Sequence, residues 1–88
     1  MARELAIEGD VVDWAEANDW LVRKCVYAGR RGSPDRWAFK DGRLVLMEIK
    51  RPGESPDGIQ QREHQRLRAA GFKVHIVRSL EDAIAALS

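Results

Sequence analysis

Two residues near the middle of the chain, Asp41-Gly42, restrict its fold more than any other feature of the sequence. A run of strand-forming residues lies on each side of this pair, over residues 36–40 and 43–51. An Asp-Gly pair between two such runs is typical of a two-residue β-hairpin turn, which needs a positive φ at both positions. The sequence therefore predicts an antiparallel hairpin whose register is set by the turn.

Two elements are predicted before the hairpin. Apolar residues recur at helical spacing over residues 4–17 and predict a helix; they are Leu5, Val11, Val12 and Ala15. Residues 20–27 are rich in strand formers and predict a strand, which a Gly/Arg loop then connects to the hairpin.

Three elements are predicted after the hairpin. Ser55-Pro56 predicts the start of a helix that ends before Gly71, because Ser is a frequent N-cap and Pro fits the first helical turn. Residues 72–78 predict a strand, and Ser79 predicts the N-cap of a last helix. The 88 residues then form one domain in the order α-β-β-β-α-β-α, an α/β fold with helices on a mixed sheet.

The charge of the chain is concentrated in its middle third. Residues 20–51 hold nine Lys or Arg against three acids, residues 1–19 hold one Arg against six acids, and residues 52–88 hold five of each. A basic segment attracts phosphate groups, but a solvated charged surface has the same composition. Charge alone favours a solvated surface over a nucleic-acid partner.

The sequence lacks the features of exported and membrane proteins. No apolar run approaches the ~20 residues that span a bilayer, and the first residues form no apolar signal region. The single cysteine, Cys25, excludes an internal disulfide and fits a reducing compartment. We therefore expect a cytoplasmic protein that does not bind a membrane.

The second strand of the hairpin carries two charges among apolar residues. Because side chains alternate along a strand, Glu48 and Lys50 lie on one face near its end. If the turn pairs Lys40 with Arg43, Asp35 lies opposite Glu48, with Cβ atoms roughly 4.5–5.5 Å apart. Two facing carboxylates repel each other unless a cation lies between them, so we predict a divalent-metal site beside Lys50.

Simpler interpretations of these acids remain open. Glu48 and Lys50 could form an ordinary ion pair at a strand end, although Asp35 opposite and basic residues on both flanks favour the metal site. Glu8 lies on the apolar stripe of the first helix, where an unpaired acid is costly. It either reaches the same metal site or points toward solvent.

The order of these motifs resembles one group of nucleases. G-x-P-D over residues 32–35, followed by E-x-K over residues 48–50, resembles the PD-(D/E)XK nuclease superfamily. The likeness is closer to its virus-type replication-repair nuclease (VRR-NUC) family and covers nearly the whole chain, including the Gly/Arg loop before the hairpin and the Gln-bearing segment over residues 60–68. The E-x-K triplet alone is weak evidence, whereas the three motifs in order within one small domain are specific.

The resemblance implies a restriction-endonuclease-like fold and Mg²⁺- or Mn²⁺-dependent cleavage of DNA. It implies that the metal ligands are Asp35, Glu48, the backbone carbonyl of Ile49 and Glu8. Lys50 matches the catalytic lysine of the family. The glutamine of the family matches Gln60, with the adjacent Gln61 as the alternative.

We therefore expect an endonuclease that binds the DNA backbone without sequence preference. Five basic residues are expected to make these contacts: Lys24, Arg30, Arg31, Arg36 and Arg51. The resemblance further implies a phage or prophage protein in a bacterial host cell. It also implies a homodimer that selects Holliday junctions or other branched DNA during replication, recombination or repair.

Two other classes of function remain as alternatives. A DNA-binding module with a catalytically silent site would show salt-dependent DNA binding without metal-dependent turnover. An interaction subunit, in which the acids form structural ion pairs, would bind neither metal nor nucleic acid.

Overall fold

The computed structural model describes residues 2–88. Its elements follow the order α-β-β-β-α-β-α, as the sequence predicts. They are α1 (Ala2–Ala17), β1 (Leu21–Arg23), β2 (Arg36–Lys40), β3 (Arg43–Ile49), α2 (Gly58–Ala69), β4 (Lys73–Val77) and α3 (Leu80–Ala86). The strands form one sheet in the order β1-β2-β3-β4, with β3 and β4 parallel and the other neighbours antiparallel.

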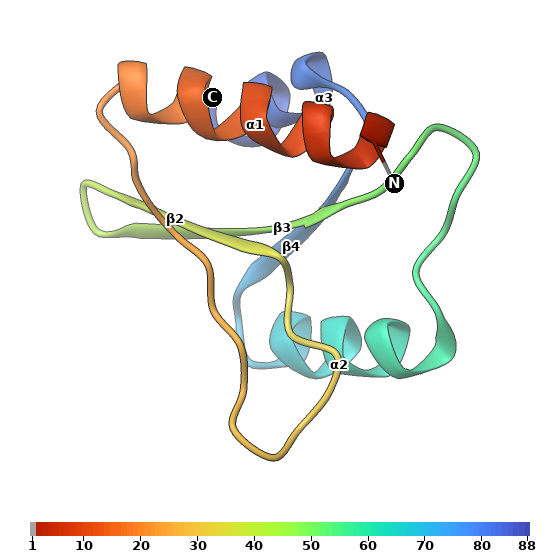
Figure 1. Cartoon of the computed structure of the whole chain (residues 1–88). Helices are drawn as coiled ribbons and strands as arrows, with labels where there is room; N and C mark the ends of the chain where they lie inside the picture. The colour runs from red at the N-terminus through yellow and green to blue at the C-terminus, as the bar shows by residue number, and fades with distance from the viewer. Residues whose placement is uncertain (1) are drawn as a thin grey trace.

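The sheet separates the helices into two layers (Figure 1). Helices α1 and α3 cover one face, and α2 covers the other. The main apolar core is made of Val11, Ala15, Trp20, Val22, Ala38, Val45, Met47, Ile49, Val77, Ala83 and Leu87. Because side chains alternate along β3, Leu46 and Glu48 are buried on the other face, toward α2. A buried carboxylate therefore lies in the layer between the sheet and α2.

The hairpin has the predicted register. Asp41 and Gly42 have φ values of 50° and 76°, as a two-residue turn of this kind requires. Lys40 pairs with Arg43, and the pairing continues in step to the start of β2. The hairpin therefore brings the residue before β2, Asp35, next to the end of β3.

The first strand is shorter than predicted, because the chain leaves the sheet after Arg23. Residues 24–35, which we call the basic loop, extend on the α2 side of the sheet (Figure 1). Within the loop, the Ser33 hydroxyl donates a hydrogen bond of 3.0 Å to the Cys25 carbonyl. This hydrogen bond satisfies the Cys25 carbonyl, which a neighbouring strand would otherwise have paired. Strand propensity alone does not reveal such a side-chain contact.

Helix α2 begins later than predicted. Its N-cap is Asp57, not Ser55, and Asp57 forms a capping box with Gln60. Two reciprocal hydrogen bonds to the first turn stabilise this start. The predicted start at Ser55-Pro56 was therefore wrong by two residues, although the helix ends before Gly71, as expected.

The prediction that Leu5 belongs to the apolar stripe of α1 was wrong. Leu5 is 62% exposed, whereas Val11 and Ala15 are fully buried. The core contacts of α1 therefore come from its second half, together with the half-buried Ile7, Val12 and Trp14. Across residues 2–88, no helix is both long and apolar enough to span a membrane.

Gly32 allows the basic loop to pack closely against α2. Its φ is +100°, and a Cβ at this position would lie 3.1 Å from Glu63 Cβ and 3.2 Å from the Ile59 carbonyl oxygen. We expect Gly32→Ala to lower the free energy of unfolding by about 1–3 kcal/mol in urea titrations, since strain and overpacking add. Gly29→Ala is the matched control because Gly29 also has a positive φ but open space around it. Equal losses in the two variants would contradict the proposed close packing.

Candidate active site

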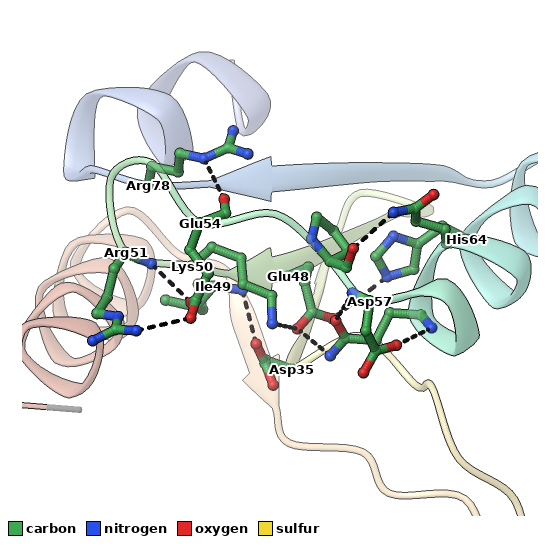
Figure 2. Close-up of polar contacts among 12 residues, drawn as sticks. Asp35, Glu48, Ile49, Lys50, Arg51, Glu54, Asp57, His64 and Arg78 are labelled. Carbon is green, nitrogen blue, oxygen red and sulfur yellow. Dashed lines mark hydrogen bonds and ion pairs between the residues drawn. The ribbon is translucent and has the colours of Figure 1, made fainter.

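Glu48 is the centre of a polar cluster at the end of β3 (Figure 2). The residue is 1% exposed. Its Oε2 accepts a hydrogen bond of 3.2 Å from Gln60 Nε2 and lies 3.7 Å from Lys50 Nζ. Its Oε1 lies 3.4 Å from His64 Nε2 but is buried without a hydrogen bond from any residue in the range 2–88. An unsatisfied buried carboxylate oxygen costs free energy, so this atom is poised to accept a ligand.

Asp35 joins the same end of the hairpin. Its Oδ2 accepts a hydrogen bond of 2.8 Å from the backbone N–H of Ile49 (Figure 2). Ile49 directly follows Glu48 on β3, so the bond holds the Asp35 carboxylate beside the end of that strand. The structure thus brings together the two acids that the hairpin register predicts to be neighbours.

The proximity of the two acids affects their ionisation. Burial raises the pKa of Glu48 to about 8, and the negative charge of Asp35 acts in the same direction. The positive charge of Lys50 opposes this change without cancelling it. A buried carboxyl group with a raised pKa, next to a second carboxyl group, is typical of a functional site.

The first turn of α2 orients Gln60 toward Glu48. Gln60 Oε1 accepts a hydrogen bond of 3.0 Å from the Asp57 backbone N–H, as part of the capping box. With its oxygen used there, the amide directs its Nε2 to the Glu48 carboxylate. Gln61 instead donates to the Pro56 carbonyl at 2.8 Å. Of the two candidate glutamines, Gln60 contacts the site.

His64 closes the cluster from the next turn of α2. It is 2% exposed, and burial, followed by the positive charge of Arg68, lowers its pKa. The imidazole is therefore neutral near pH 7 and adds no positive charge beside Glu48. The sequence carried a signal for this contact, since His64 lies four residues after Gln60 on the same helical face.

Glu8 has a different partner from the one expected. Its Oε2 lies 2.6 Å from Arg36 Nε in a half-buried ion pair. Within residues 2–88, no three His, Cys, Asp or Glu side chains form a group that could hold a metal. The structure therefore does not bring Glu8 to Asp35 and Glu48, and its role as a metal ligand stays a prediction.

The five residues predicted to contact DNA differ in solvent exposure and in ion pairing. Lys24 and Arg31 are exposed. Arg51 forms an exposed ion pair of 3.0 Å with Glu54, and Arg30 lies 3.6 Å from Glu63. Arg36 is the least available because its side chain is 23% exposed and paired with Glu8. These contacts stay predictions.

Known proteins resemble the chain over almost its full length. A solved structure described as "VRR_NUC domain" superposes with a TM-score of 0.89 at 32% identity, over 97% of this chain and 94% of that chain. The chain is also 40% identical over 80 residues to "Putative nuclease p44" of Acyrthosiphon pisum secondary endosymbiont phage 1, which is 90% of this chain and 86% of that protein. The chain belongs to the VRR-NUC family. No family model matches the sequence.

Membership of the VRR-NUC family confirms the predicted family and fold, and makes a nuclease the function class of the chain. The polar cluster of this VRR-NUC domain contains Asp35, Glu48 and Lys50 of the motifs, together with Gln60 and His64.

Glu63 is a buried polar residue of the VRR-NUC domain that was not among the predicted site residues. This acid is buried in α2 and contacts the basic loop through Tyr27 and Arg30. The partners lie more than 30 residues before Glu63, so no helical or strand periodicity pointed to them.

Proposed function

We propose that the protein is a metal-dependent endonuclease that hydrolyses phosphodiester bonds in DNA. One observation carries the proposal: the buried Glu48 carboxylate lies beside Asp35, and its Oε1 has no hydrogen bond within the described residues. Two acids so close together are costly to keep ionised in a fold unless they bind a cation. Lys50, whose side chain is only 13% exposed, lies next to them as a further charged group.

Mg²⁺ or Mn²⁺ is the cofactor that fits this pair of acids. Hard divalent cations prefer carboxylate oxygens, and Mg²⁺ is commonly held by one or two carboxylates plus waters and substrate phosphate oxygens. Asp35 and Glu48 would supply the two carboxylates, and we propose the Ile49 carbonyl as a further ligand. Glu48 Oε1, which is buried and accepts no hydrogen bond within residues 2–88, supports this assignment.

The side chains around the acids have separate roles in the proposed mechanism. A divalent cation held by Asp35 and Glu48 would neutralise charge at the scissile phosphate and would lower the pKa of a water. Lys50 orients the attacking water and offsets the negative charge that develops on the phosphate. Gln60 fixes the orientation of Glu48 by donating to Oε2, and the capping box of α2 fixes Gln60 in turn.

The DNA substrate would contact residues outside the pair of acids. We propose that exposed basic side chains bind the DNA backbone, with Lys24, Arg30 and Arg31 the most available of the predicted set. We further propose a homodimer acting on four-way junctions or other branched DNA, since a two-fold axis would present two sites to two strands. A phage or prophage protein in a bacterial cytoplasm is the proposed setting, which the phage origin of the p44 relative supports.

The competing function is a DNA-binding module with a silent nuclease fold. The Glu8–Arg36 ion pair favours it, because this pair leaves two acids rather than three at the site. Metal-dependent turnover separates the two functions.

The proposed function predicts that purified protein cuts a labelled four-way junction in Mg²⁺ or Mn²⁺ and not in excess EDTA. A linear duplex of the same sequence measures selectivity for branches. Denaturing gels would follow the products over time. Cutting that persists in EDTA would contradict the metal requirement, and binding without cutting in either metal would favour the silent module.

A further inference from the structure

A buried acid on α2, the helix that carries Gln60 and His64, links the basic loop to this helix. Glu63 is 7% exposed, although an acid at this depth needs partners. Its Oε2 accepts a hydrogen bond of 2.9 Å from the Tyr27 hydroxyl. Burial, and then this bond, raise the pKa of Tyr27 to about 12, so the hydroxyl remains a donor. Tyr27 therefore fixes the loop to α2 at this residue.

The other carboxylate oxygen of Glu63 attracts two arginines. Arg30 Nε, from the basic loop, and Arg66 Nη1, from α2, each lie 3.6 Å from Oε1. Their side chains are 56% and 61% exposed, so both guanidinium groups also face solvent. Glu63 Oε1 accepts no hydrogen bond within residues 2–88, so charge attraction alone draws these two like charges from separate elements toward one buried oxygen.

The free donors of these arginines suit a phosphate group. A guanidinium has five N–H donors, and Arg30 approaches Glu63 through Nε, which leaves both terminal nitrogens for another acceptor. Such a planar pair of donors matches two phosphate oxygens. The group of one acid and two arginines also keeps a net positive charge, which attracts a polyanion.

Glu63 and its two arginines lie close to the active site along α2. Glu63 follows Gln60, which contacts Glu48, by three residues, a rise of about 4.5 Å along the helix. A DNA strand whose scissile phosphate lies at Asp35 and Glu48 could therefore place a nearby phosphate at Arg30 and Arg66.

We propose that Glu63 is a positioning residue that holds Arg30 and Arg66 together as a clamp for a DNA backbone phosphate beside the cleavage site. This inference rests on the proposed function, because it takes DNA as the substrate. It adds Arg66 to the expected contacts and assigns a role to Tyr27, the anchor of the clamp.

The test measures DNA affinity in EDTA, so that binding is separated from cutting. Fluorescence anisotropy with a labelled duplex at 50–200 mM salt, a range over which phosphate contacts dominate, would compare the full-length variants. Arg30→Ala and Arg66→Ala should each weaken binding about three- to tenfold and reduce the slope of log K against log salt by about 1. Lys73→Ala is the control, since it removes an exposed positive charge from β4.

Whether Glu63→Gln strengthens or weakens DNA binding decides whether Glu63 positions the arginines. Removing an acid should strengthen DNA binding if charge alone matters, as expected for the exposed acid in the Glu16→Gln control. A positioning role predicts the opposite, a loss of about threefold or more, because the arginines are released. Tyr27→Phe changes no charge and should weaken binding in the same direction, which keeps the test valid if Glu63→Gln unfolds the protein.

Two results would overturn the clamp: tighter binding by Glu63→Gln, or unchanged salt slopes in both arginine variants. Neither result depends on cutting. If the wild type cuts DNA and these variants bind normally, the clamp fails and the proposed function stands. If the wild type never cuts but the variants lose affinity as expected, the clamp stands and the nuclease proposal fails.

Discussion

Replacing Glu48 by Gln is expected to lower the rate of metal-dependent DNA cleavage about a thousandfold or more. The change keeps the shape of the side chain but removes the charge that would bind the cation. Losing a metal-centred stabilisation of about 4 kcal/mol in the transition state corresponds to this factor. Single-turnover cleavage of the labelled junction measures it directly.

The control for this variant is Glu16→Gln, which makes the same chemical change at an exposed position on α1. It should cut at the wild-type rate. Circular dichroism should show that both variants are folded. A Glu48→Gln protein that cuts within tenfold of the wild-type rate would contradict the assignment of Glu48.

The same variant also tests the ionisation of Glu48 without metal. The folded protein holds a proton on Glu48 up to about pH 8, whereas the unfolded chain releases it near pH 4.5. The folded state therefore binds more protons, and the free energy of unfolding falls as pH rises between these values. His64 and His75 have lowered pKa values and act in the opposite sense, mostly below their usual 6.5 and to a small extent up to about pH 7.5.

Urea titrations of the wild type and Glu48→Gln between pH 6.5 and pH 8 isolate the effect of Glu48, because the two histidines contribute equally to both proteins. We expect wild-type stability to fall by up to about 2 kcal/mol over this range in EDTA. Saturating Mg²⁺ should reduce the fall, because a cation replaces the proton, and Glu48→Gln should remove it. A flat wild-type profile would show that Glu48 is ionised at neutral pH in the metal-free protein.

Replacing Lys50 by Ala is expected to lower the cleavage rate about a hundredfold or more while leaving the fold intact. Its ammonium lies 3.7 Å from Glu48 Oε2 and is mostly shielded from solvent, so its charge acts strongly on the reacting phosphate. DNA affinity should fall by no more than the loss of one phosphate contact, since the role of Lys50 is in the transition state.

Lys73→Ala serves as the control for Lys50 because its side chain is exposed on β4. Its cleavage rate should match that of the wild type. A Lys50→Ala protein with a normal rate and weaker DNA binding would make Lys50 a substrate-binding residue and contradict its proposed chemical role.

The part of the site that lies on the hairpin was predictable from sequence. Asp41-Gly42 set the register, and the register placed Asp35 beside Glu48. Both inferences depend on local rules: turn residues with positive φ and the alternation of side chains along a strand. The superposition with the solved VRR_NUC structure then confirmed a fold that these local rules had already outlined.

The contacts between elements were not predictable in the same way. Glu8 pairs with Arg36 and Tyr27 with Glu63 across 28 and 36 residues, and only the packed fold brings these residues together. The start of α2 is different, because Asp57 and Gln60 have the spacing of a capping box that the sequence displayed. Ser55-Pro56 was an equally plausible local start, and the contact of Gln60 with Glu48 adds a tertiary reason for the observed one.

A crystal structure of the protein soaked in Mn²⁺ tests most directly whether the two hairpin acids share a cation. We expect an anomalous peak within about 2.5 Å of oxygen atoms from both Asp35 and Glu48, with Lys50 adjacent. The same soak of Glu48→Gln should lose or weaken the peak. A fully soaked wild-type crystal with no peak between these carboxylates would contradict the metal site and the nuclease mechanism built on it.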